Sequence, residues 1–180
     1  MDLTLISIVV GLGLTELLLT FHQLFRARRR VAWDALPLAW AALLLIVVVN
    51  YWWGIRASTA TASGWTAAEF MLVMISPVFL FLACAAALPR IEPGARLDMK
   101  AAYAEERTAF LLFLFGYQAG NWILDLSGLT ASQPLVLVVR GIASAALVTA
   151  LLTRSRRWDW TALAIIAAAF AVRLATQLVS

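Results

Sequence analysis

Residues 71–88 read MLVMISPVFLFLACAAAL, a run without a single charged side chain. A transmembrane helix needs about 20 predominantly apolar residues to cross the hydrocarbon core of a bilayer. The apolar character extends upstream to give a run over 65–88, and Pro89 follows it directly. This stretch therefore predicts a membrane-spanning helix, and it decides the fold class.

Similar apolar runs occupy most of the remaining chain. Of the 180 residues, 63% are hydrophobic and 13% are charged, and the mean hydropathy is +0.89. A soluble domain is about 45–50% apolar and about a quarter charged. We therefore predict an all-α integral membrane protein, a compact bundle of six transmembrane helices forming a single domain over 1–180. The predicted spans are 3–25, 35–55, 65–88, 108–126, 134–153 and 160–179.

The basic residues predict how this bundle is oriented. Of the 14 Lys and Arg residues, 11 fall in the first, third and fifth loops, one in the second loop and two inside spans. Cytoplasmic loops carry the excess of Lys and Arg, so we expect both termini on the non-cytoplasmic side. The cluster Arg26, Arg28, Arg29 and Arg30 lies in the first of these loops. We interpret it first as a topology signal, and a site for anionic lipid head groups at the cytoplasmic face is the alternative.

The segment 97–107 differs from the other loops. Its pattern is typical of an amphipathic cytoplasmic helix that leads into the span 108–126, with Asp98 at the N-cap. Small residues recur at the spacing that lets helices approach closely, as in Gly116 and Gly120. Packing inside one molecule explains such pairs, and a homodimer face is the alternative.

A few polar side chains interrupt the spans. Ionisable groups within a bilayer are costly unless they are paired or hydrated, so each is a candidate site. Gln118, Asn121 and Asp125 share one helix face by their spacing. We expect Arg140 to pair with Glu69 or Asp125. The pocket or ion-pair candidates are Glu16, Glu69, Gln118, Asn121, Asp125, Arg140 and Arg173. Two readings stay open, a polar pocket open to the outside and a structural cluster that sets helix register.

Glu16 is placed near the middle of the first span. A buried carboxyl without a partner favours its neutral form and could exchange a proton. That property suits a proton-coupled carrier. It equally suits a structural hydrogen bond to Ser76 or to the backbone carbonyl that Pro77 leaves free.

Several classes of function are disfavoured. The only histidine, His22, and the only cysteine, Cys84, lie in different runs, so no metal-ligand set is predicted. Neither a phosphate-binding loop nor a catalytic triad is visible, so we expect no cofactor and lean away from an enzyme. Each basic loop is too short to form a nucleic-acid surface.

Two hypotheses remain. The first is a small solute or ion carrier or channel, with a polar pocket in the outer half of the bilayer and Glu16 as the protonatable group. The second is a non-transporting scaffold, sensor or assembly subunit whose polar cluster is structural. In both cases the expected location is multi-pass in a membrane, taken to be the bacterial inner membrane, and the lipid bilayer is the expected partner.

Overall fold

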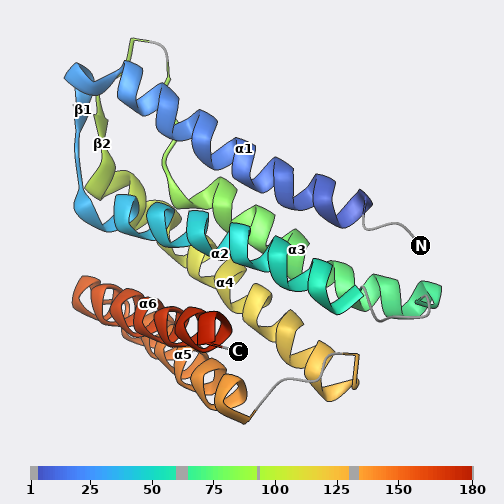
Figure 1. The fold of residues 1–180 in the computed structure, drawn as a ribbon. Helices are drawn as coiled ribbons and strands as arrows, with labels where there is room; N and C mark the ends of the chain where they lie inside the picture. The colour runs from blue at the N-terminus through green and yellow to red at the C-terminus, as the bar shows by residue number, and fades with distance from the viewer. Residues whose placement is uncertain (1–3, 60–64, 93, 130–133, 180) are drawn as a thin grey trace.

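The computed structural model describes residues 4–59, 65–92, 94–129 and 134–179. Within these ranges, the side chains of residues 55–59, 173 and 176–179 lie outside the described part. Long helices account for most of what is described (Figure 1). They are α1 (Thr4–Arg26), α2 (Ala35–Thr59), α3 (Ala67–Ala87), α4 (Met99–Leu126), α5 (Pro134–Thr153) and α6 (Arg156–Val179).

The helices confirm the all-α prediction and the membrane environment. Five of them, α1 to α5, are long and apolar enough to cross a membrane among the described residues. The chain is therefore a polytopic membrane protein. Large apolar side chains such as Met71, Leu126 and Leu152 are 70%, 83% and 79% exposed on its surface, where lipid can cover them. The sixth span, 160–179, and the side on which the termini lie stay predictions.

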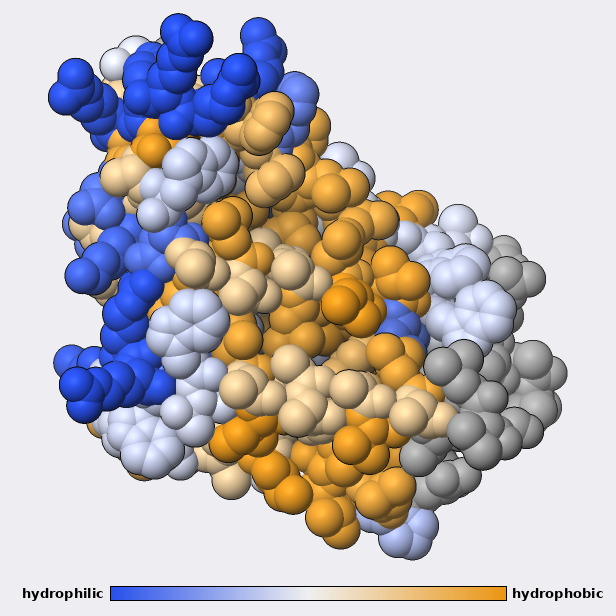
Figure 2. Space-filling view, turned by 60° about the vertical axis from the view of Figure 1, so that its left-hand side comes forward, coloured by the Kyte–Doolittle hydropathy of each residue, from blue (hydrophilic) through white to orange (hydrophobic). Residues whose placement is uncertain are grey.

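Hydrophobic and charged residues occupy different parts of the surface. Figure 2 shows a broad hydrophobic face, with the hydrophilic residues gathered along one edge of it. The connections from α1 to α2, from α3 to α4 and from α5 to α6 lie at the same end of the bundle (Figure 1). These connections and the helix ends that adjoin them carry the 11 basic residues counted above, so we call this end the basic end.

α3 packs against both α1 and α4, and small residues lie at both contacts. A Cβ added to Gly13 of α1 would lie 3.3 Å from the Cα of Phe81, and one added to Gly120 of α4 would lie 2.6 Å from the Ser76 hydroxyl. Small side chains let membrane helices approach closely, where dispersion contacts hold them together. The core is therefore centred on α3 and its two neighbours.

The start of α3 and the start of α4 are both capped. Thr66 and Glu69 form a capping box at α3, in which each side chain accepts a hydrogen bond from the other residue's backbone N–H. Asp98, the predicted N-cap, accepts hydrogen bonds from the Lys100 and Ala101 amides. α4 continues from there without a break to Leu126, so the amphipathic segment and the span are one helix.

Three short elements at the basic end were not predicted. A 3-10 turn, η1 (Arg28–Arg30), follows α1 and leads into strand β1 (Val31–Ala32). β1 pairs in parallel with β2 (Leu97–Asp98), with Val31 opposite Leu97. The pairing joins the connection after α1 to the connection before α4. Hydropathy does not reveal it, because two-residue strands carry no measurable periodicity.

Candidate functional site

A cavity of about 80 Å³ lies between α2, α4, α5 and α6, and it is partly open. Most of its lining comes from buried apolar side chains, among them Leu44 of α2, Leu114 of α4 and Leu147 of α5, which we call its floor. Two polar side chains also line it, those of Gln118 and Arg140, and we call them its polar rim. Because the lining is mostly apolar, the cavity differs from the predicted polar pocket, and only these two of the candidate residues border it.

Arg140 is held by an ion pair with Asp125 beside this cavity. The two side chains are only 10% and 8% exposed. The same guanidinium nitrogen donates to the backbone carbonyl of Asn121 at 3.1 Å. Of the two partners considered from the sequence, the structure selects Asp125. We call Arg140, Asp125 and the Asn121 carbonyl the Asp125 cluster, which joins α4 to α5.

Trp122 adds two contacts to this junction. The Arg140 guanidinium lies 5.8 Å from the centre of the Trp122 ring, within the range of a cation–π interaction. The Trp122 indole N–H donates to the Ser144 hydroxyl at 3.1 Å, and Ser144 in turn donates to the Arg140 carbonyl. The side-chain amide of Asn121 donates to the Tyr117 carbonyl on its own helix. These polar groups are therefore engaged within the protein.

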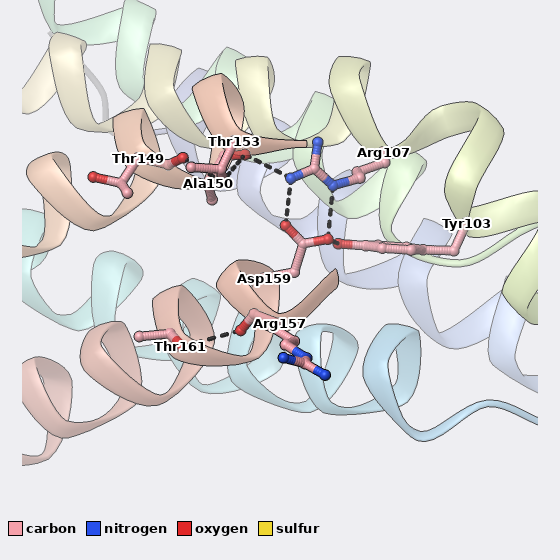
Figure 3. A network of polar contacts seen from close by, with 8 residues as sticks. All are labelled: Tyr103, Arg107, Thr149, Ala150, Thr153, Arg157, Asp159 and Thr161. Carbon is pink, nitrogen blue, oxygen red and sulfur yellow. Dashed lines mark hydrogen bonds and ion pairs between the residues drawn. The ribbon is translucent and has the colours of Figure 1, made fainter. Parts of the chain in front are cut away.

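A second buried ion pair lies at the basic end, where sequence reasoning placed only loop charges (Figure 3). Arg107 of α4 donates through Nε and Nη2 to the two carboxylate oxygens of Asp159 in α6, at 2.7 and 2.6 Å. Arg107 also donates to the Ala150 carbonyl of α5 at 2.6 Å, and Tyr103 donates to Asp159 at 3.4 Å. We call this group the Asp159 cluster.

The Asp159 cluster is shielded from solvent. The Asp159 side chain is 1% exposed and that of Arg107 is 10% exposed. Such bidentate pairs are strong because two parallel hydrogen bonds carry the charge interaction. Asp159 also lies in the first turn of α6, where a negative charge is favoured by the helix dipole. One sequence signal could have revealed the cluster, the i, i+4 spacing of Tyr103 and Arg107 on an otherwise apolar face.

Asp34 and Arg156 make a third pair, between the start of α2 and the start of α6. Their closest described contacts include Arg156 Nη2 to Asp34 Oδ2 at 2.6 Å, and the Leu36 amide donates to Asp34 at 2.9 Å. Burial raises the pKa of Asp34, but the Arg156 and Leu36 hydrogen bonds and the Arg156 charge outweigh it. The pKa of Asp34 therefore lies below its ordinary value.

This lowered pKa predicts a specific acid sensitivity. The Asp34 contribution to stability is complete above the unfolded-state pKa, about 3.9, and is lost as pH falls through the lower folded-state pKa. We expect Asp34→Asn to lower the thermal unfolding midpoint at pH 7, with the difference from the wild type shrinking toward pH 3. Midpoints measured across this range test it, with the exposed Glu105→Gln as the control. A difference that stays constant with pH would contradict it.

The environment of Glu16 differs from the buried, unpaired one expected from the sequence. Its carboxylate lies 2.6 Å from Nη2 of Arg90, and these side chains are 29% and 72% exposed. Gly13 packs against Phe81 and Cys84 of α3. Glu16 lies three residues, or about 4.5 Å, further along α1. It is therefore level with the segment that follows the end of α3. The hydrogen bond to Ser76, one of the alternatives considered for Glu16, is not formed, and the Ser76 hydroxyl has no hydrogen-bond partner among the described residues.

Glu69 lies in the first turn of α3, where it makes local contacts. Its carboxylate accepts hydrogen bonds from the Thr66 amide at 2.7 Å and from the Thr66 hydroxyl at 2.9 Å. It therefore serves the capping box of α3 and does not border the cavity. The sequence pattern Thr66-x-x-Glu69 is itself a capping-box signature and was the signal for this role.

Two further sets of candidates complete the comparison. Arg173 belongs to α6, and its side chain lies outside the described residues. Arg26, Arg28, Arg29 and Arg30 are all exposed at the basic end, and the Arg28 guanidinium lies 5.3 Å from the Phe25 ring centre. In the described parts of the chain, no three His, Cys, Asp or Glu side chains are placed to hold a metal ion.

Comparison with known proteins adds no assignment. No protein-family model, curated protein or solved structure matches the chain. Function must therefore be argued from the arrangement of the residues described above.

Proposed function

We propose that the protein is a non-transporting membrane scaffold or assembly subunit, in which buried ion pairs hold the α5–α6 hairpin against α2 and α4. One observation supports this above all. The hairpin is clamped at both ends, by the Asp125 cluster at one and by the Asp159 cluster with Asp34–Arg156 at the other. These ion pairs fix the helices in place, because separating a buried pair would leave an uncompensated charge in a low-dielectric setting.

The carrier hypothesis has less support. It needs a protonatable carboxyl at mid-depth and a charged pocket open to one side. Glu16 is paired with Arg90 near the end of α3, and Glu69 caps α3. The cavity still favours a carrier as the second candidate, because Gln118 and Arg140 border a partly open space between four helices.

Reconstitution separates the two candidates. For a scaffold, we expect purified protein in liposomes to give no more flux than empty liposomes across a panel of ions and small solutes. The charge exchange Asp125→Arg with Arg140→Asp is the matched variant, since it keeps both charges and reverses their order. A scaffold predicts that the exchange regains part of the stability lost in each single change. Saturable wild-type flux that the exchange abolishes would instead establish the carrier.

We further propose that the basic end faces the cytoplasm and that both termini lie on the opposite side. The distribution of 11 of 14 basic residues supports this. We also propose that the protein is located in the inner membrane and that Arg26, Arg28, Arg29 and Arg30 bind anionic lipids. A homodimer is a further proposal. Basic residues near a membrane surface attract anionic head groups, which supports the lipid proposal.

Cysteine labelling tests the orientation. The native Cys84 is 2% exposed and packs near Gly13, so Cys84→Ala gives a background free of thiols. We expect Ser127→Cys to react with a membrane-impermeant maleimide in intact cells, and Arg154→Cys to react only after permeabilisation, because both sites are exposed at opposite ends. The reverse labelling pattern would invert the proposed topology.

A further inference from the structure

The cavity has an apolar floor and a polar rim at one end. Leu44 and Leu147 of the floor are each 1% exposed, and Ala143 is 4% exposed. The polar rim consists of Gln118 and Arg140, and Arg140 is part of the Asp125 cluster. The polarity of the cavity therefore changes along its length, as the polarity of an amphiphile does.

Water is a poor occupant of the floor. A buried water usually needs two to four polar partners, and a cavity lined by apolar side chains stays dry. The floor supplies leucine, valine and alanine side chains together with the buried Trp40 ring. Three of the four helices around it, α2, α4 and α5, are long and apolar enough to cross a bilayer. The medium outside the cavity at this depth is therefore hydrocarbon, which can enter without losing hydrogen bonds.

We infer that this cavity binds one acyl chain of a bilayer phospholipid, with the ester region of the lipid at the polar rim. Ester carbonyls accept hydrogen bonds, and the Gln118 amide carries two N–H donors. The tail then occupies the floor between the hairpin and α2 and α4, between the two ion-pair clamps. This site goes beyond the scaffold role, because it assigns a ligand that neither the ion pairs nor the topology requires.

Photo-crosslinking of the full chain in vesicles tests the site. The probe is phosphatidylglycerol with a diazirine at the middle of one acyl chain, and the adducts are mapped by mass spectrometry. Bulk lipid reaches Val138, which is 60% exposed on α5. Leu44 and Leu147 are reached only from inside the cavity. We expect adducts at all three residues, whereas adducts at Val138 alone would overturn the inference.

A pair of variants on α5 provides the control. Ala143 lines the cavity, and Ala145, two residues further along, is exposed. We expect Ala143→Phe to remove the Leu44 and Leu147 adducts and Ala145→Phe to leave them, with Val138 labelled in both. Unchanged floor labelling in a folded Ala143→Phe would count against the cavity as the source. If that variant does not fold, wild-type labelling still decides.

A free fatty acid with the same diazirine distinguishes the ligand source. Floor adducts with the phospholipid support the inference whatever the fatty acid does. Floor adducts with the fatty acid alone would overturn the phospholipid assignment. The flux experiment is independent, so failure of the lipid site and failure of the scaffold role give different results.

Discussion

Replacing Asp159 with alanine is expected to lower the free energy of unfolding by about 3–5 kcal/mol, the usual cost of breaking a buried ion pair from one side. The change removes both carboxylate oxygens that accept from the Arg107 guanidinium, which is only 10% exposed. Within the described part of the chain the guanidinium then keeps the Ala150 carbonyl as its acceptor (Figure 3). An unpaired charge then remains where α4, α5 and α6 meet. Denaturant titration of the detergent-solubilised protein measures the loss.

Two comparisons show whether this loss comes from the pair. Arg157→Ala changes an exposed arginine two residues away, and surface changes usually stay within about 0.5 kcal/mol. The double variant Arg107→Met with Asp159→Leu removes both charges, and we expect it to regain much of the loss, because apolar replacement of a buried pair is often neutral. An Asp159→Ala variant as stable as Arg157→Ala would show that the pair does not hold the hairpin.

Replacing Gly120 with alanine is expected to lower the free energy of unfolding by about 1–3 kcal/mol, as overpacking of a close contact does. The added Cβ would lie 2.6 Å from the Ser76 hydroxyl and 3.0 Å from the Ser76 backbone nitrogen. A hydroxyl can rotate, but the backbone of α3 cannot move without separating α3 from α4. The same denaturant titration measures the change.

Gly141 is the matched control for this substitution. It also lies inside a helix, but a Cβ added there would meet nothing within 4 Å. We expect Gly141→Ala to be neutral or to stabilise by up to about 1 kcal/mol, because alanine is the better helix former. Equal stability of the Gly120 and Gly141 variants would contradict the close approach of α3 and α4.

The two glycines also show why part of the packing was beyond prediction. Both belong to small-residue patterns in the sequence, Gly116 with Gly120 in α4 and Gly141 with Ala145 in α5. The α4 pattern meets a neighbouring helix closely at Gly120, whereas a Cβ added to Gly141 would meet nothing within 4 Å. A pattern marks a face where helices are able to approach, whereas the partner helix and its register depend on all the contacts of the bundle.

The contacts of the candidate site were also predicted only in part. The spacing of Asn121 and Asp125 placed them on one face of α4, and Arg140 was expected to need a carboxylate partner. The structure pairs it with Asp125, while Glu69 completes a local capping box. Glu16 meets Arg90, which is distant in sequence, because α3 ends level with the middle of α1. A membrane depth counted in residues along each separate helix does not account for the axial shift between neighbouring helices.

The sequence by itself determined the membrane environment, the positions of the helices and the cap at Asp98. These properties depend on local apolar length and on hydrogen bonds between near neighbours, both of which can be read along the chain. Only the tertiary structure decided the long-range pairs, such as Arg107 with Asp159, and the cavity beside α5. In a low-dielectric interior a charge must find its partner wherever the folded helices bring one, and that meeting depends on the packing of the whole bundle.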